Sequence, residues 1–286
     1  MPNCSVSNIN CHVNTGVFFR VACFLFLTLA SAGDLFARAR PSSSPSSSAA
    51  VIWIVIVGLV LFFAGLFAIF FYLDRKRSDK IQVVATRLGL TFRRKPTDAD
   101  KALIVGCHIA NSGHSHITSN VLEAAQSEEL RMTLFDHVYT VGYGKSSQQY
   151  NQTVTRMQSP VLHLPAFILF PETFFSKIGK LFGGADVNFP EAPQFSKKYI
   201  LRGPDEGAIR SLFNPALLQF LEQQQRPLSV DAAGDTLFVH RTSRRAKPEE
   251  IEAYVAEGKQ ILAKFFEAQS SVRPPAPPPL PPPLPS

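Results

Sequence analysis

Four residues on one predicted strand and the turn after it could carry acid–base chemistry: Asp136, His137, Tyr139 and Lys145. Carboxylate, imidazole, phenol and amine groups all transfer protons when they lie beside a substrate. Asp136 is the most informative of them because it interrupts an apolar face, and a partly buried carboxylate must be paired or have its pKa raised. These four residues are the candidates for a catalytic site, and none is assigned a role.

A structural ion pair is the favoured interpretation of Asp136. If the turn of the predicted hairpin centres near Ser146, Arg156 lies opposite Asp136 on the same face of the sheet. A buried charge needs such a partner. His137 and Tyr139 point to the opposite face, because side chains alternate along a strand.

A second group of residues has the types that bind zinc: Cys107, His108, His114 and His116. On an extended chain, His114 and His116 would point the same way. The surrounding segment is rich in Gly, Ser and Asn, however, and no second anchored pair of ligands completes a rigid site. A solvated loop is therefore favoured over a metal site.

The turn Gly144-Lys145-Ser146 resembles the end of a phosphate-binding P-loop. That motif needs a glycine five residues before Gly144, where Tyr139 stands. A dinucleotide fingerprint fails as well, because Ser147 occupies the position of its third glycine. We read a hairpin turn here and expect no cofactor.

The elements that must position these residues form an α+β domain. A hairpin is predicted from strands over 130–141 and 150–157, and a loop over 106–120. Strands and helices do not alternate in a βαβ rhythm, so we expect an antiparallel sheet packed by helices. Further strands are predicted at 166–170, 198–201, 228–231 and 236–241, and helices at 81–90, 173–182, 205–212, 215–225 and 248–267.

An uncharged run of 25 residues, Ala49 to Leu73, predicts a transmembrane helix in the lipid bilayer. About 20 apolar residues suffice to cross the hydrocarbon core. Basic residues follow the run directly from Arg75 to Lys80, which places the C-terminal side in the cytoplasm. With 18% charged residues the chain is less charged than a typical soluble protein, which agrees with a membrane protein.

The segment before this helix has two interpretations. Residues 1–32 contain a short apolar stretch ending in Ala30-Ser31-Ala32, which is typical of a signal peptide, although a short membrane segment fits as well. Both put the C-terminal domain on the same side. Residues 33–48 form a Ser/Pro-rich spacer.

The rest of the chain divides into a cytoplasmic domain, residues 74–269, and a proline-rich disordered tail, residues 270–286. Nine of the last fourteen residues are proline, which favours polyproline II. Such a tail either binds an aromatic-lined groove of a protein partner or is a passive extension. No nucleic acid partner is expected.

Three segments resemble an uncharacterised bacterial family of membrane-anchored proteins with a cytoplasmic α+β domain. They are Leu134 to Lys145 (LFDHVYTVGYGK), Gln152 to Val154 (QTV) and Phe195 to Gly203 (FSKKYILRG). His137 departs from the aromatic residue usual in that family. The resemblance implies the domain boundaries, over about residues 80–267, and a bacterial inner-membrane address. It implies no activity.

The function favoured by the sequence is a membrane-tethered binding or scaffold module. No HExxH, GxSxG, CxxC or EF-hand pattern is present. The alternative is a membrane-tethered enzyme or small-ligand sensor that uses the strand and turn from Asp136 to Lys145.

Overall fold

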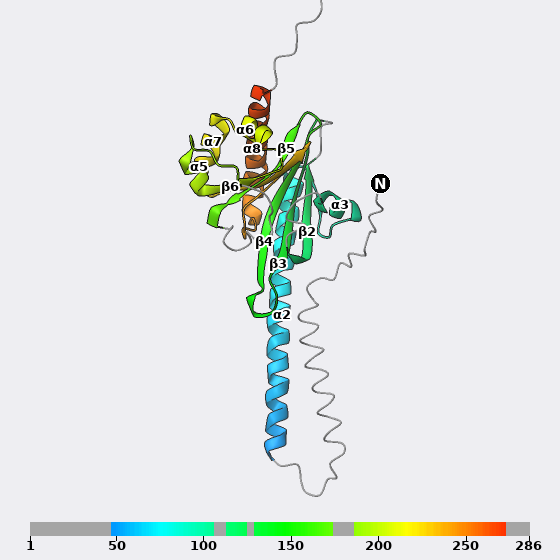
Figure 1. Ribbon diagram of the computed structural model, residues 1–286. Coiled ribbons are helices and arrows are strands. Elements are labelled where there is room, and N and C mark those ends of the chain that lie inside the picture. The colour runs from blue at the N-terminus through cyan, green and yellow to red at the C-terminus, as the bar shows by residue number, and fades with distance from the viewer. Residues whose placement is uncertain (1–46, 106–112, 125–128, 174–185, 273–286) are drawn as a thin grey trace, which may run out of the picture. The chain divides into compact units, whose positions relative to one another are not determined.

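The computed structural model describes residues 47–105, 113–124, 129–173 and 186–272 (Figure 1). The chain forms two compact units, one up to Asp79 and one from Lys80 onward. The helices are α2 Ser47–Arg87, α3 Asp98–Val105, α5 Pro193–Lys198, α6 Glu206–Leu212, α7 Pro215–Glu222 and α8 Ile251–Val272, with short 3-10 turns η2 Gly144–Ser146 and η4 Pro248–Glu250. The strands are β1 Leu90–Arg93, β2 His114–Ala124, β3 Arg131–Val141, β4 Gln148–Gln158, β5 Leu164–Pro171, β6 Tyr199–Arg202, β7 Ser229–Gly234 and β8 Thr236–His240.

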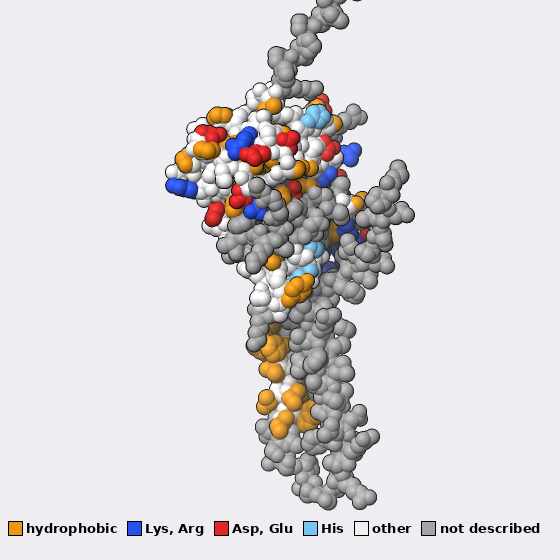
Figure 2. Space-filling model, in the orientation of Figure 1, with side chains coloured by type: hydrophobic (Ala, Val, Ile, Leu, Met, Phe, Trp, Pro, Cys, Tyr) orange, Lys and Arg blue, Asp and Glu red, His pale blue; other side chains and the backbone are white. Residues whose placement is uncertain are grey.

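Helix α2 contains the apolar run predicted to cross a membrane. It is the one helix among the described residues that is long and apolar enough to do so. Its large apolar side chains are exposed, as the orange atoms along it in Figure 2 show. The helix predicted over 81–90 is the continuation of α2, which runs without a break to Arg87. Gly89 follows with a φ of 68°, a conformation that ends helices.

The second unit is built on one eight-stranded sheet in the order β1-β2-β3-β4-β8-β7-β5-β6, in which every neighbouring pair is antiparallel. The predicted α+β class with an antiparallel sheet packed by helices is therefore confirmed. Short hairpins join β3 to β4 and β7 to β8, which agrees with the preference of antiparallel strands for tight turns.

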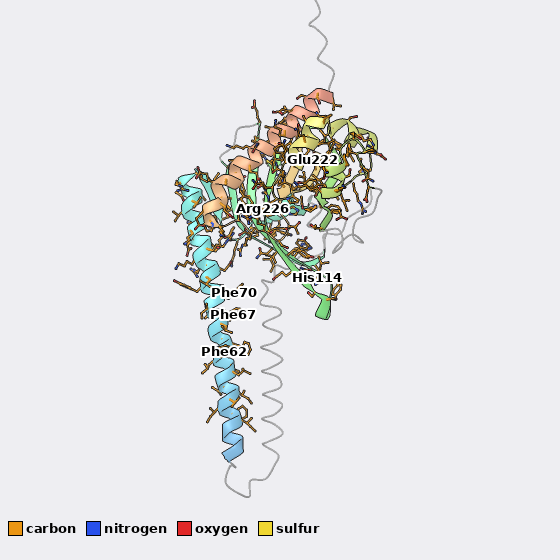
Figure 3. All side chains as sticks on the ribbon, turned by 90° about the vertical axis from the view of Figure 1, so that its left-hand side faces the viewer. Phe62, Phe67, Phe70, His114, Glu222 and Arg226 are labelled. Carbon is orange, nitrogen blue, oxygen red and sulfur yellow. The ribbon has the colours of Figure 1, made fainter. Side chains whose placement is uncertain are left out.

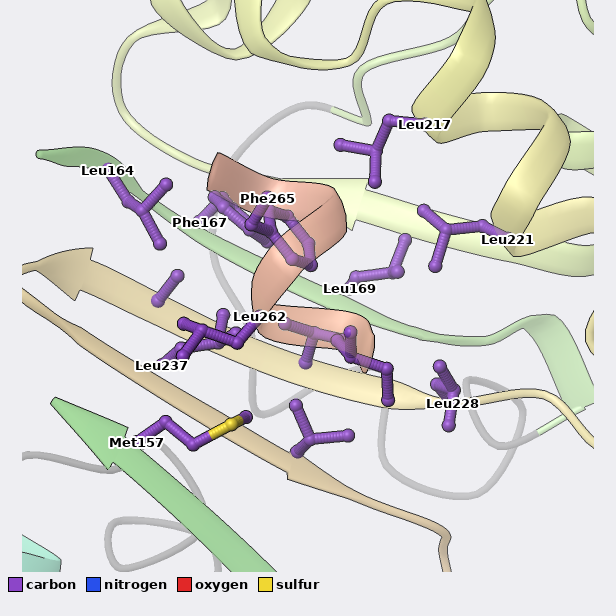
Figure 4. Packing of buried hydrophobic residues seen from close by; sticks show 14 of the residues in the cluster. Met157, Leu164, Phe167, Leu169, Leu217, Leu221, Leu228, Leu237, Leu262 and Phe265 are labelled. Atoms are coloured by element: carbon purple, nitrogen blue, oxygen red, sulfur yellow. The ribbon is translucent and has the colours of Figure 1, made fainter. Parts of the chain in front are cut away.

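The main core lies between one face of the sheet and the helices, and we call this side the helix-covered face. Met132, Leu134 and Met157 point into it from β3 and β4, and Phe265 of α8 packs on Phe167 of β5 at a ring distance of 5.8 Å. Figure 4 shows α8 lying over the strands, with leucines of α7 and of the sheet interlocking around it. The C-terminal end of α2 contributes Ile81 and Ala85 to the same cluster.

A smaller aromatic cluster lies on the other side of the sheet, which we call the opposite face. It contains Phe135, Tyr139, Tyr150, Val154 and Phe238. Tyr139 and Tyr150 are cross-strand neighbours whose rings stack at 5.2 Å. The sheet thus buries side chains on both faces, so strict apolar and polar alternation does not describe its central strands.

Helix α7 begins as the sequence predicts. The side chain of Asn214 accepts a hydrogen bond from the backbone N–H of Leu217 at 3.0 Å, and Pro215 occupies the first turn. Helix α6 is capped in the same way by Asp205, whose carboxylate accepts from Ala208 at 2.9 Å.

The predicted loop over 106–120 is wrong in its second half, because β2 begins at His114. The Gly, Ser and Asn content concealed this strand. Two of its residues, Ser115 and Asn120, adopt positive φ angles, and its pairing with β3 shifts register near each of them. Strand β1 and helices α3 and α5 were not predicted. The predicted helix over 173–182 lies outside the described residues beyond Thr173.

We expect Gly203→Ala to destabilise the domain by about 2 kcal/mol, as overpacking of a core does. A Cβ atom at Gly203 would overlap the backbone carbonyl oxygen of Ala166 and lie 2.5 Å from Cδ1 of Ile209. Ala166 lies in β5 between Leu164 and Phe167, which are both paired with β7, so its carbonyl cannot move away cheaply. Thermal unfolding of the full chain in detergent, followed by circular dichroism, measures the effect.

The matched control is Gly207→Ala in helix α6. A Cβ there meets only the side chain of Asp205, at an ordinary contact distance of 3.5 Å. Alanine also favours helix over glycine. An equal loss of stability in the two variants would contradict the steric argument at Gly203.

Candidate functional site

Asp136 lies on β3 on the helix-covered face and is only 2% exposed. Its carboxylate accepts hydrogen bonds from Thr153 Oγ1 at 2.6 Å, Asn120 Nδ2 at 2.9 Å and Arg245 Nε at 3.1 Å. Arg245 also forms the ion pair that a buried carboxylate needs. Three donors from β2, β4 and the segment after β8 therefore hold this side chain in place.

The predicted pairing of Asp136 with Arg156 is wrong. The observed register sets Asp136 opposite Thr153 and places Arg156 opposite Thr133, on the opposite face. Val141 pairs with Gln148, so the turn centres between Gly144 and Lys145 instead of near Ser146. A shift of the turn centre by this amount moves every cross-strand partner by three residues and changes its face.

The four candidate catalytic residues do not converge. Asp136 faces the helices, whereas His137 and Tyr139 lie on the opposite face, His137 at 2% and Tyr139 at 1% exposure. The side chain of Lys145 is outside the described part of the chain. A shared catalytic constellation needs side chains within hydrogen-bond reach of one substrate, and the sheet itself separates these.

The candidate metal ligands are also separated. Cys107 and His108 lie outside the described residues. Between His114 and His116, the positive φ of Ser115 interrupts the extended chain, so the two rings have different neighbours. His114 stacks on Tyr143 at 4.7 Å, whereas His116 Nδ1 lies 3.3 Å from His137 Nε2. In the described ranges no group of three His, Cys, Asp or Glu side chains is placed to hold a metal ion.

The buried imidazoles of His137 and His240 and the half-buried imidazole of His116 lie on the opposite face instead. His137 hydrogen-bonds His116 and Thr118, the latter at 3.1 Å through Nδ1. Burial, with a smaller contribution from the proximity of His116, lowers the pKa of His137 to about 4. Burial likewise lowers the pKa of His240 on β8 to about 3, with a contribution from His137. These rings are therefore neutral at physiological pH.

Gln152 lies on the same face, cross-strand from His137. Its side chain is fully buried, yet neither its amide nitrogen nor its amide oxygen has a hydrogen-bond partner, and the same is true of Nδ1 of His240. Buried polar atoms are normally satisfied by protein or by ordered water. Gln152 is two residues from Tyr150 on β4, so these two side chains are neighbours on the same face of the sheet.

Tyr150 forms part of the wall of a pocket at one end of the sheet. The pocket has a volume of about 340 Å³, which falls in the range of small-ligand sites. It lies where β4 and β7 begin and where β5 and β8 end. Its lining residues are Tyr150, Pro171, Thr173, Arg226, Pro227, Arg241, Thr242, Ser243 and Arg244.

Three arginines and three residues with hydroxyl groups line this arginine pocket, and both kinds of side chain are hydrogen-bond donors that suit an anion. Arg241 is held by a bidentate pair to Glu257 of α8, with both distances 2.5 Å. Arg244 pairs with Glu250 of η4 at 2.7 Å. Arg226, which lies beyond the end of α7 and is labelled in Figure 3, forms no ion pair with any described residue and is exposed.

Sequence reasoning missed this pocket. The run Arg241-Thr-Ser-Arg-Arg245 is a local signal, since it places three arginines and two hydroxyls within five residues. Tyr150, Pro171 and Arg226 are far from that run in sequence, and only the strand order brings them to it. Ser243 has a φ of 55°, which shows that the run makes a tight turn instead of continuing β8.

Comparison with known proteins adds little to this geometry. No protein-family model matches the chain, and no curated protein does. Among solved structures the chain is similar to the crystal structure of the mycobacterial trehalose monomycolate transport factor A, TtfA. The two share 12% sequence identity over 71% of this chain and 99% of that chain, with a TM-score of 0.44. A similarity at this level carries no inference about function.

Proposed function

We propose that this protein is a membrane-tethered binding module whose ligand is anionic and occupies the arginine pocket. The observation that carries the proposal is the lining of that pocket, which contains three arginines together with Tyr150, Thr242 and Ser243. Binding sites are concave and combine an apolar wall with a few placed polar groups.

The tether in this proposal is the apolar part of helix α2. Its apolar side chains are exposed to an extent that water would not tolerate over such a length, and lipid would cover them. The basic residues after Leu73 favour a cytoplasmic second unit in a bacterial inner membrane. The domain division at residue 74 and the proline-rich tail from residue 270 belong to the same proposal.

The hydrogen bonds of the Asp136 carboxylate favour a scaffold with a ligand site over an enzyme that uses Asp136. Its oxygens accept from Asn120, Thr153 and Arg245, so a substrate would have to displace a buried ion pair to reach it. Neither Asp136 nor His137 lines the arginine pocket. In this proposal Asp136 stabilises the fold.

The test is the thermal stability of the full chain in a neutral detergent with anionic, neutral and cationic small molecules. Any ligand of the native state stabilises it, by about 2.7 kcal/mol at 100 times its Kd. We expect anionic compounds to raise the unfolding temperature and Arg226→Ala to abolish the increase. Arg226 is exposed, so its replacement should leave the fold intact.

Arg87→Ala is the matched control. Arg87 is an exposed arginine of the same unit that pairs with Glu252 at 3.5 Å and does not line the pocket. The Arg87→Ala variant should still show the increase in unfolding temperature with anionic compounds. Stabilisation by neutral compounds alone, or an equal loss of the anion effect in both variants, would overturn the proposed function.

A further inference from the structure

The charge of the arginine pocket can be counted from its ion pairs. Glu257 compensates Arg241, and Glu250 compensates Arg244, each through a hydrogen-bonded carboxylate. Arg226 has no such partner among the described residues. Among the lining arginines and their ion-pair partners, three positive and two negative charges leave a single positive charge in excess, that of Arg226.

The two compensating carboxylates also limit the negative charge that a ligand of this pocket can carry. Glu250 lies close enough to act on Arg226 as well, since that arginine contributes to the lowered pKa of Glu250. A second negative charge on a ligand would therefore have to approach both Arg226 and an ionised Glu250. Like charges at short range repel by about 1 to 4 kcal/mol near a protein surface.

The remaining lining is apolar or only weakly polar. Tyr150, Pro171 and Pro227 form one part of the wall. A space of about 340 Å³ is an order of magnitude larger than the roughly 30 Å³ taken by one water molecule in the liquid. A bare inorganic anion would leave most of this space unfilled, so the ligand carries an uncharged part that lies against these residues.

We infer that the arginine pocket recognises a monoanion in which one negative charge is shared by two equivalent oxygens, attached to an uncharged ring or apolar group. A carboxylate and a phosphodiester both have this chemistry, and Arg226 would receive the charged end in bidentate fashion. A phosphomonoester, which is dianionic above neutral pH, is disfavoured. The inference rests on the proposed function and names the ligand class for the same pocket.

The experiment compares three probes of similar size on the full chain in neutral detergent at pH 8: benzoate, methyl phenyl phosphate and phenyl phosphate. The first two are monoanions, and the third is a dianion. We expect calorimetric affinities for one or both monoanions at least about tenfold above that for phenyl phosphate. Tighter binding of phenyl phosphate would overturn the inference while leaving the proposed function intact, and no binding of any probe would overturn both.

Glu250→Gln is the decisive variant. Glutamine keeps the acceptor oxygen for the backbone N–H of Lys247, which Glu250 binds at 3.0 Å, but it removes one negative charge. We expect the affinity for phenyl phosphate to rise about tenfold and the preference for monoanions to shrink or reverse. Glu267→Gln is the control, because Glu267 pairs with Lys264 and does not line the pocket or pair with its arginines. An unchanged preference in Glu250→Gln would contradict the charge count.

A final arm separates a lipid headgroup from a soluble ligand. The chain is placed in nanodiscs of phosphatidylcholine, with or without phosphatidylglycerol, whose headgroup is a phosphodiester monoanion. If methyl phenyl phosphate binds more weakly in nanodiscs that contain phosphatidylglycerol than in nanodiscs of phosphatidylcholine alone, the lipid headgroup competes for the pocket. That result supports a lipid source. Equal binding in both nanodiscs supports a soluble monoanion.

Discussion

Replacing Asp136 by alanine is expected to lower the free energy of unfolding by about 4 kcal/mol, the size typical of breaking a buried ion pair. The substitution leaves Arg245 without its carboxylate and removes the acceptor of Thr153 and Asn120. Each of these donors would lose a charged acceptor at a partly or fully buried position, which adds a desolvation cost. The three donors come from separate segments, so their anchoring to one another is lost as well.

Urea unfolding of the full chain in neutral detergent, followed by circular dichroism, measures this loss. Asp98→Ala is the matched control, because the Asp98 side chain is 98% exposed and pairs with Lys101 on the surface. Exposed pairs contribute about 0 to 1 kcal/mol. Asp136→Asn should fall between the two, since it keeps an acceptor but removes the charge. A loss below about 1 kcal/mol in Asp136→Ala would be incompatible with a structural ion pair.

Acidification is expected to cost the domain at least about 3 kcal/mol between pH 6.5 and pH 4, because of its buried histidines. The folded-state pKa of His137 is lowered to about 4 and that of His240 to about 3, whereas both titrate near 6.5 when unfolded. The unfolded chain therefore binds more protons than the native chain in this range. The stability that these neutral rings provide is complete above pH 6.5 and is lost progressively as the pH falls.

The pH window separates this effect from that of the carboxylates. Asp100 and Asp235 have folded-state pKa values below the ordinary 3.8, through their hydrogen bonds and ion pairs, so the stability they provide is lost only below that pH. Replacing both His137 and His240 by glutamine should flatten the slope of stability against pH between 6.5 and 4. Replacing the exposed His163 by glutamine should leave that slope as it is. An identical slope in the double variant would show that other groups cause the acid sensitivity.

The local features of the fold could be predicted from the sequence, because they depend on neighbouring residues. The hairpin of β3 and β4 is visible in two runs of β-branched and apolar residues on either side of a glycine-containing turn, and the start of α7 is visible in Asn214 and Pro215. The apolar run within α2 needs only its length and composition. Strand β2 was not predicted because its bulges interrupt the two-residue alternation of side chains on which strand prediction rests.

The pairing register was the first feature that sequence could not settle. An error of one and a half residues in the turn centre assigned Arg156 to Asp136, whereas the structure gives that place to Thr153 and supplies the arginine from position 245. Arg245 lies 109 positions from Asp136, so no local pattern connects them. Long-range partners of this kind depend on which strands become neighbours, and β8 reaches β4 only by a non-local pairing.

The sequence by itself determined the membrane-crossing length of the apolar run, the α+β class, the approximate positions of many helices and strands and the absence of familiar catalytic motifs. Each of these depends on composition or on a period of a few residues. The tertiary structure alone decided that Asp136 is a buried structural carboxylate, that His137 and His240 are neutral, and that Arg226, Arg241 and Arg244 share one pocket. Burial and charge compensation are properties of the neighbours in space, and for these residues the neighbours come from strands and turns that are distant along the chain.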